Sequence, residues 1–281
     1  MIVQRRDVFL PSFWLKYTYD DKGNRTQQKS LAPAKVNGAA DETTDYTYTT
    51  PGHAHALTST SRFTAGAPTA KTTAGYTYDA AGAVTGRTST ASGQSFTAAY
   101  TDDGRTKTLN TTGTSTTAYV YDADGNILIR RDPVNTDTTP ATTTTVRTAF
   151  IGSDQYRVVA GTTGITTTRQ YTHAGVTIAE RVGTAPISWL FTDANHTVSV
   201  AVATTTGGAI GTTTRRFFDP FGKTLAPTTG GTWPDNNKFL NTPTNTLDLV
   251  DMGARLYDPG IGRFLTVDPI LTPYQPRQNN G

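Results

Sequence analysis

Three residues near the end of this 281-residue chain, Arg255, Asp258 and Asp268, have side chains suited to acid–base chemistry. Two carboxyl groups held close together do not both ionise easily, so one keeps a proton while the other stays charged. Such a pair could activate water and protonate a leaving amide, and the guanidinium of Arg255 could orient one carboxylate. Both aspartates also precede a proline, and aspartate commonly begins a turn. The catalytic and the turn interpretation both stay open on these residues.

The elements that must position these residues are predicted to be β-strands. Only 17% of the residues are charged, and the chain is rich in threonine, glycine and tyrosine. That composition does not favour long helices, whereas β-branched threonine suits strands. The 13 Tyr, 11 Phe and 3 Trp residues argue against disorder, because disordered segments are poor in aromatic residues. We therefore predict an all-β chain.

Composition also excludes several classes of site. There is no cysteine, so a thiol nucleophile, a disulfide and a thiolate metal site are all excluded. The net charge of +3 comes from basic residues scattered singly or in pairs, so no nucleic-acid partner is expected. No apolar run approaches the roughly 20 residues of a membrane span, and the N-terminus does not resemble a signal peptide. His53 and His55 lack an evident third ligand, so we expect no metal and no cofactor.

A tandem repeat organises the chain. Segments 17–25, 76–87 and 119–130 each carry Tyr-x-Tyr, then Asp, then a glycine three residues later. The two rings share one face of a strand, the aspartate caps a turn, and the glycine supplies the positive φ. Each unit is therefore a hairpin, and lone hairpins are only marginally stable, so we expect them to pair edge to edge into a spiralling antiparallel sheet.

We expect the tyrosines and aspartates of the repeat to stabilise the sheet rather than to bind a ligand. We expect an aromatic ladder along the sheet, because cross-strand rings stabilise strand pairs, and we expect the aspartates to cap turns. The predicted ladder consists of Tyr19, Tyr48, Tyr78 and Tyr121, and the predicted caps are Asp20, Asp79 and Asp122.

These Tyr-Asp-x-x-Gly-Asn units resemble the YD repeats of bacterial RHS (rearrangement hot spot) proteins, Tc-toxin C components and teneurins. Segment 218–222 followed by Phe239 and Leu240 resembles the opening of the RHS repeat-associated core domain, and segment 252–270 resembles its hallmark block. The resemblance implies a hollow shell of spiralling strands that encloses a toxic C-terminal polypeptide. It also implies a core domain that plugs the shell and cuts the chain by aspartic-type self-cleavage.

Under this resemblance, Asp258, Asp268 and Arg255 are the catalytic residues, and the activity is autoproteolysis in the complete protein rather than repeated turnover. We predict a lead-in at 1–16, a shell wall at 17–214 and an irregular core domain at 215–281 that is incomplete at its C-terminus. The implied partners are a C-terminal toxin cargo, absent here, and further repeats or a Tc-B-like shell component that caps the wall. The implied location is secreted or cell-surface.

A second function stays open beside enclosure. Related repeats occur in cell-surface proteins, so the chain could be a non-enzymatic carbohydrate-binding or adhesion module. That alternative requires the repeat tyrosines to face solvent, where their rings could stack on sugars. Buried tyrosine rings would count against it.

A third interpretation is that this chain is a truncated relative of these proteins without activity.

Overall fold

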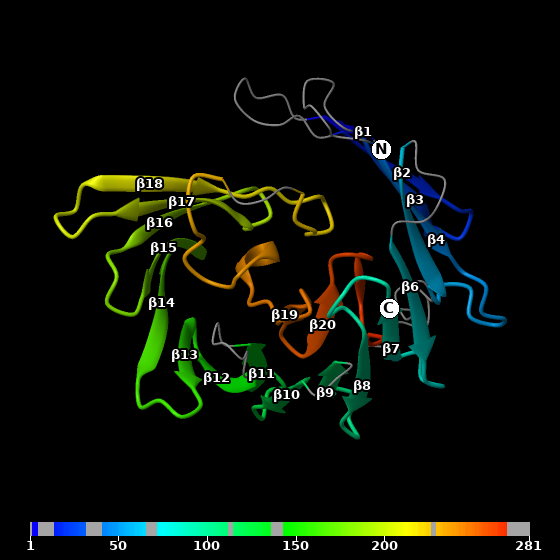
Figure 1. Cartoon of the computed structure of the whole chain (residues 1–281), viewed down its shortest axis with the longest axis horizontal. Helices are drawn as coiled ribbons and strands as arrows, with labels where there is room; N and C mark the ends of the chain where they lie inside the picture. Colours follow the sequence, from blue (N-terminus) through cyan, green and yellow to red (C-terminus); the bar gives the residue numbers. More distant parts are fainter. Residues whose placement is uncertain are drawn as a thin grey trace. The chain divides into compact units, whose positions relative to one another are not determined.

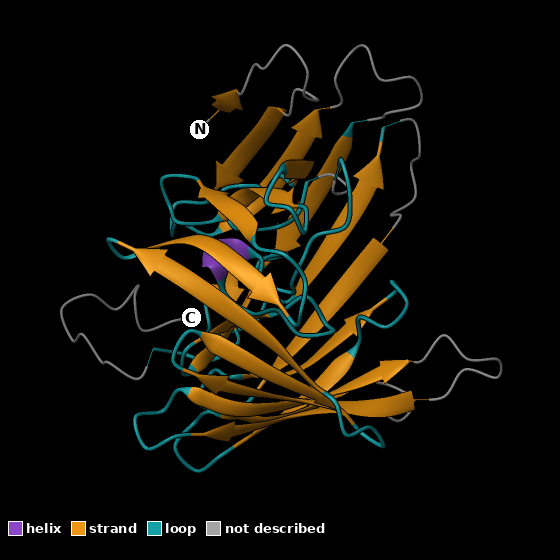
Figure 2. Cartoon of the chain, turned by 90° about the vertical axis from the view of Figure 1, so that its left-hand side faces the viewer, coloured by secondary structure: helices purple, strands orange, loops and turns teal. Residues whose placement is uncertain are grey.

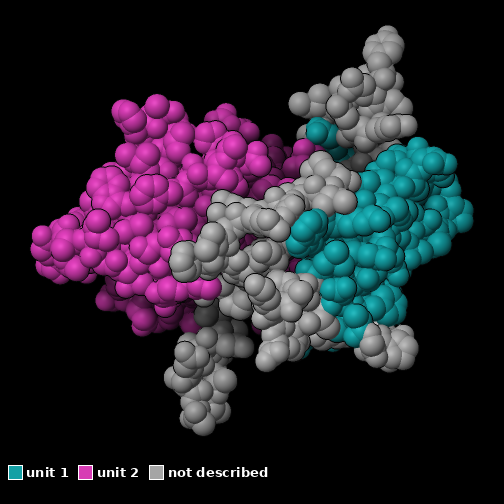
Figure 3. Space-filling model, turned by 90° about the horizontal axis from the view of Figure 1, so that it is seen from above, with its two compact units in different colours: residues 1–98, 266–281 teal, residues 99–265 magenta. Residues whose placement is uncertain are grey.

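The computed structural model confirms an all-β chain built from antiparallel hairpins. Figure 2 shows strands throughout, with one short 3-10 helix, η1 (Phe239–Asn241), among the described residues. None of the described helical structure is long and apolar enough to cross a membrane. The chain forms two compact units, residues 1–98 with 266–281 (unit 1) and residues 99–265 (unit 2), coloured separately in Figure 3. The residues described are 2–4, 14–31, 41–65, 72–111, 115–135, 143–225 and 229–268.

Unit 1 is a run of antiparallel strands in which each strand pairs with the next along the chain. The pairing is continuous from β1 to β8. The last of these strands extends into the first residues of unit 2. The strands are β1 (Ile2–Gln4), β2 (Trp14–Tyr19), β3 (Arg25–Leu31), β4 (Glu42–Thr47), β5 (Ser59–Thr64), β6 (Thr72–Tyr78), β7 (Val84–Ser89) and β8 (Phe96–Tyr100).

Unit 2 repeats this pattern from β9 to β18 and then changes character. Its sheet curves around residues 216–265, which we call the core segment (Figure 1). The core segment contains η1 and a small antiparallel sheet of β19 (Val250–Met252), β20 (Arg255–Asp258) and β21 (Arg263–Phe264). The large-sheet strands are β9 (Thr106–Thr111), β10 (Ser115–Tyr121), β11 (Ile127–Asn135), β12 (Thr143–Ile151), β13 (Asp154–Val159), β14 (Ile165–His173), β15 (Val176–Val182), β16 (Ser188–Thr192), β17 (Val198–Thr204) and β18 (Ile210–Arg215).

The predicted turn caps are confirmed. The Oδ1 atom of Asp20 accepts hydrogen bonds from the backbone N–H groups of Lys22 and Asn24, at 3.0 and 2.8 Å. Gly23 follows with φ of 84°, a left-handed conformation that glycine adopts without steric cost. Equivalent side-chain caps occur at Asp79, Asp122, Asp193, Asp219 and Asn245.

The tyrosines of the repeat divide into two structural roles. The first tyrosine is buried in three units, as Tyr17, Tyr46 and Tyr119 show with 6% exposure each, and Tyr76 is partly buried. In three units the second tyrosine donates its hydroxyl to a backbone carbonyl near the end of the preceding hairpin turn, whereas Tyr19 is 47% exposed. These bonds join Tyr48 to Arg25 at 3.1 Å, Tyr78 to Leu57 at 2.9 Å and Tyr121 to Thr106 at 2.8 Å. The second tyrosine therefore ties successive hairpins together.

Candidate functional site

Asp258 lies at the end of β20 and is almost fully buried. Its Oδ1 atom accepts a hydrogen bond from the Gly260 N–H at 2.8 Å, and its backbone carbonyl accepts one from the Gly262 N–H at 2.8 Å. Gly262 has φ of 70°, and a Cβ there would lie 2.8 Å from the Phe221 ring. The aspartate therefore begins a tight turn that is packed against the rest of the core segment.

The register of the small sheet separates Asp258 from Arg255. Alternate residues of a strand face opposite sides, so these two side chains leave β20 on different faces. Arg263 is the residue directly opposite Asp258 on β21. The guanidinium carbon of Arg255 lies 3.8 Å from the centre of the Phe264 ring, a cation–π arrangement. Arg263, which the sequence analysis did not single out, is therefore the cross-strand neighbour of Asp258.

Asp268 belongs to unit 1, whereas Asp258 and Arg255 belong to unit 2. The residue before it, Val267, lies against the turn of the second repeat, since a Cβ on Gly82 would be 3.1 Å from a Val267 methyl carbon. The catalytic pairing of Asp258 with Asp268 stays a prediction. The predicted C-terminal part of the core domain, residues 269–281, lies outside the described residues.

Arg130 on β11 is the centre of a buried charge cluster that joins the sheet to the core segment. Its Nε donates to Asp132 Oδ2 at 2.5 Å, and a second guanidinium nitrogen forms an ion pair with Asp251 on β19. A third donates to the Thr244 carbonyl at 3.2 Å. The planar guanidinium can serve all three acceptors at once. Removal from water raises the pKa of Asp251 to about 6, although the Arg130 charge opposes this shift.

A second buried cluster lies on the same face of the sheet and consists of Glu180 on β15, Arg216 and Asp235. Glu180 is only 1% exposed. Burial and the nearby charge of Asp235 together raise the pKa of Glu180 to about 9. Burial also raises the pKa of Asp235 and lowers the pKa of Arg216 to about 10. Asp235 Oδ1 further accepts the Trp233 indole N–H at 3.0 Å.

Within the described part of the chain, no hydrogen-bond partner reaches either carboxyl oxygen of Glu180, and both oxygens are buried. A buried carboxylate without such partners is unfavourable, so burial favours the neutral, protonated form. At neutral pH, Glu180 is therefore protonated, beside the carboxyl group of Asp235 and the guanidinium of Arg216. Two neighbouring carboxyl groups, one of which keeps its proton, were predicted for Asp258 and Asp268; here other residues form such a pair.

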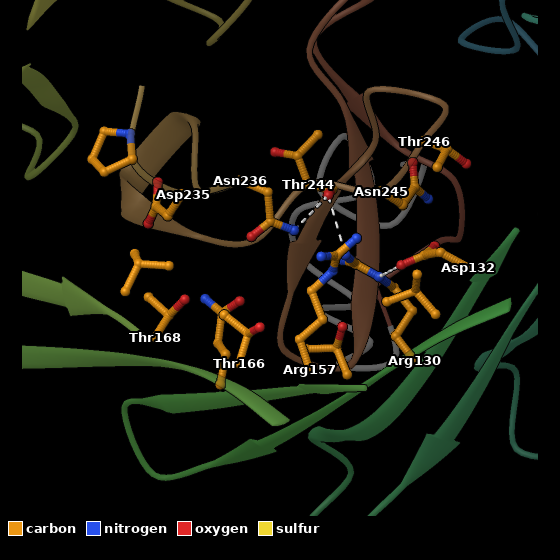
Figure 4. Close-up of a pocket in the computed structure, with 15 residues that line it drawn as sticks. Arg130, Asp132, Arg157, Thr166, Thr168, Asp235, Asn236, Thr244, Asn245 and Thr246 are labelled. Atoms are coloured by element: carbon orange, nitrogen blue, oxygen red, sulfur yellow. Dashed lines mark hydrogen bonds and ion pairs between the residues drawn. The ribbon is translucent and has the colours of Figure 1, made fainter. Parts of the chain in front are cut away.

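A polar cavity of about 390 Å³ lies between the sheet and the core segment, next to both clusters. Figure 4 shows Arg157, Thr166 and Thr168 on the strand side, facing Asn236 and Thr244 of the core segment. Most of the residues that line it have polar or charged side chains. The face of the sheet that meets the core segment thus combines polar side chains with an apolar cluster of Leu190, Val198 and Ala201 that packs against Trp233. We call this side of the sheet the inner face.

No family model matches the sequence, and no curated protein matches it. Solved structures do match. A crystal structure of TcdB2-TccC3 without the hypervariable C-terminal region aligns with 95% of this chain at TM-score 0.61 and 14% identity. TcdB2-TccC3 aligns with 96% at TM-score 0.58 and 14% identity. The Photorhabdus luminescens Tc holotoxin pore aligns with 95% at TM-score 0.58 and 15% identity.

The fold is that of an RHS-type β-shell. This chain spans 16–17% of the length of the matching chains. The predicted spiral of hairpins thus corresponds to a known toxin-complex architecture, and the likeness extends over nearly the whole sequence. At this low identity, the comparison establishes the fold alone.

Neither buried cluster was predicted from the sequence. Arg130 ends the third repeat and was counted among scattered basic residues. Glu180 and Asp235 are 55 positions apart and lie in no common motif. One signal was available for Glu180: it is one of only two glutamates in the chain.

Proposed function

We propose that this chain is a section of a hollow β-shell that encloses a C-terminal polypeptide. The observation that carries the proposal is the set of polar side chains that are buried on the inner face of unit 2. An antiparallel sheet normally buries apolar side chains, but here Arg130, Glu180 and Gln155 point toward the core segment and are buried. Gln155 donates to the Asn237 side chain at 2.8 Å. A polar inner wall suits contact with an enclosed polypeptide chain.

The shell fold and the inner face together support the proposal that this chain and further components enclose a cargo. We propose that a toxin cargo follows the core segment, and that further repeats or a Tc-B-like component complete the wall. Such a complex would be secreted or displayed at the cell surface. Enclosure predicts that a cargo fused after residue 281 and co-expressed with such a component resists added protease while the shell is folded. Cargo degraded as fast as the same cargo free in solution would contradict enclosure.

We further propose that the cargo is released by aspartic-type self-cleavage carried by Asp258 and Asp268, with Arg255 as a charge-orienting residue. One carboxylate would take a proton from water, and the resulting hydroxide would attack the scissile carbonyl carbon. The other carboxyl would donate its proton to the leaving amine as the C–N bond breaks. The likeness of segment 252–270 to the RHS hallmark block and the burial of Asp258 support this mechanism.

The cleavage proposal is tested on a gel after a reporter segment is appended to the chain. We expect a second band with the natural sequence, and its loss in Asp258→Asn and Asp268→Asn. The matched control is Asp248→Asn, because Asp248 is an exposed aspartate of the same core segment that pairs with Lys238. Uncut protein in a folded shell, or cleavage that survives both substitutions, would contradict the mechanism without affecting enclosure.

Most of the repeat tyrosines do not favour the adhesion alternative, although Tyr19 is 47% exposed. Tyr17, Tyr46 and Tyr119 are buried, so their rings offer no platform on which a sugar could stack. The hydroxyls of Tyr78 and Tyr121 are used within the sheet. We therefore favour enclosure. Retention of specific glycans on an array, lost when a repeat tyrosine is substituted, would restore the alternative.

A further inference from the structure

The sheet of unit 2 has a second face that the proposed function does not use. Residues directly opposite each other in paired antiparallel strands share a face. Arg130, Thr148, Arg157 and Thr166 form one such row and lie on the inner face. The alternate residues point away from the core segment. We call the side that they form the outer face.

The outer face carries arginines placed directly opposite one another. Arg131 on β11 is paired with Arg147 on β12, and Arg169 on β14 is paired with Arg181 on β15. All four side chains are exposed. Like charges in directly opposed positions destabilise a sheet unless an anion balances them. Asp154 pairs with Arg169 at 3.2 Å, and no ion pair is found within the described residues for the other three.

The pattern recurs in unit 1, where Lys16 on β2 is directly opposite Lys29 on β3 and both are exposed. Arg215 at the end of β18 adds another exposed cation to the outer face of unit 2, opposite Val200. Opposed cations thus occur in three strand pairs. The same destabilising arrangement of like charges thus recurs, and this points to a negatively charged partner outside the chain.

Large hydrophobic side chains are exposed on the same face. Tyr171, Ala179 and Trp189 form one row across β14, β15 and β16, and the small alanine leaves both rings open to solvent. Trp189 is 46% exposed and Phe191 is 55% exposed. An exposed apolar patch next to cations marks an interaction surface. The large exposed hydrophobic residues on the outer face are Val120, Ile151, Ile165, Tyr171, Trp189 and Phe191.

From this combination we infer that the outer face of unit 2 docks onto an anionic lipid bilayer. The contact surface is the β14–β18 patch, which comprises Arg169, Arg181, Arg215, Tyr171, Trp189 and Phe191. Arginine attracts anionic headgroups, and tryptophan and tyrosine suit the boundary between headgroups and acyl chains. The patch extends about 20 Å across five strands as well as along them. An extended, two-dimensional negative surface matches this layout better than a single acidic strand or loop. The inference does not depend on the enclosure proposal.

The test measures sedimentation of the full chain with lipid vesicles. We expect binding to vesicles made of equal parts phosphatidylcholine and phosphatidylserine, no binding to pure phosphatidylcholine, and loss of binding at high salt. The triple variant Arg169→Gln, Arg181→Gln, Arg215→Gln should bind about 100-fold more weakly, roughly five-fold for each arginine.

A control variant removes the same amount of charge outside the patch. It combines Lys22→Gln, Lys107→Gln and Arg157→Gln, all at exposed positions, and should bind like the natural chain. Circular dichroism checks that each variant is folded.

A separate variant tests the rings. Trp189→Ser with Phe191→Ser keeps every charge and should still weaken vesicle binding, because the rings no longer insert at the headgroup boundary. Equal binding to neutral and anionic vesicles would overturn the inference. An unchanged affinity in the folded arginine variant would do the same. Tighter binding of heparin or single-stranded DNA through the same arginines would assign the surface to an anionic polymer instead.

Discussion

Replacing Glu180 by glutamine should make unit 2 more stable above neutral pH. Buried Glu180 keeps a proton in the native state, and a glutamine amide is a neutral group of nearly the same shape that needs no proton. The side chain is 1% exposed, so water does not screen the interaction. The substitution preserves shape while it removes the need to hold a proton.

The expected size follows from the pKa of Glu180, which is about 9 in the native state against an ordinary value of 4.5. Between these values the native state holds a proton that the unfolded chain has released. Stability is therefore complete below the unfolded pKa and falls as pH rises toward the folded pKa. A difference of one proton changes the free energy of unfolding by about 1.4 kcal/mol per pH unit. From pH 5 to pH 8 the natural chain should lose up to about 4 kcal/mol through this group.

The assay is urea unfolding at pH 5 to 8, followed by tryptophan fluorescence, because the Trp233 indole donates to Asp235. Asp251 also makes the free energy of unfolding fall as pH rises, because its native pKa of about 6 is raised above the ordinary value of 3.8. That effect is common to both proteins, so their difference isolates Glu180. We expect Glu180→Gln to match the natural chain at pH 5 and to exceed it by about 2–4 kcal/mol at pH 8.

The control is Glu42→Gln, which replaces the other glutamate of the chain, a partly exposed residue that pairs with Arg62. This variant should keep the pH slope of the natural protein. If Glu180→Gln also kept that slope, or lost stability at pH 8, Glu180 would not be protonated in the native state.

Four further substitutions test the fold, the last of them as a comparison for the third. Arg130→Met should lower the free energy of unfolding by about 3–5 kcal/mol in urea, because it leaves Asp132 and Asp251 as unbalanced buried charges. Tyr121→Phe should cost about 1 kcal/mol in thermal unfolding through the lost hydroxyl bond. Gly222→Ala should cost about 2–5 kcal/mol in urea unfolding, since its Cβ would lie 2.3 Å from the Phe239 ring in a left-handed conformation. Gly23→Ala, a left-handed position with open space, should cost only about 1–2 kcal/mol.

The hairpin fold could be predicted because its determinants are local. The carboxyl group of Asp20 reaches backbone N–H groups only two and four residues away, and Gly23 supplies the left-handed residue of the same turn. Such a unit is recognisable in any single copy of the repeat. Strand pairing between neighbours then follows, because a lone hairpin does not bury enough surface.

The buried clusters could not be predicted because their partners are distant in sequence. Arg130 meets Asp251 across 121 positions, and nothing in the repeat indicates which acid will face it. Asp258 illustrates the opposite case. Its turn geometry was one of two interpretations from the residues alone, and the Gly260 bond bears it out. Its pairing with Asp268 depends on how two compact units meet, which no local pattern encodes.

The chemistry of the two clusters explains how the core segment is attached. Apolar side chains of similar volume would often give equal or greater stability than buried ion pairs. A guanidinium, however, bonds its acceptors in few geometries. Arg130, bonded to Asp132 and Asp251, and Arg216, bonded to the Val198 and Asn237 carbonyls, therefore define the register in which the core segment meets the sheet. The proton on Glu180 makes this attachment depend on pH, which an apolar contact would not. Raising the pH should therefore loosen the core segment before it disrupts the hairpins, whose turn caps need no such proton.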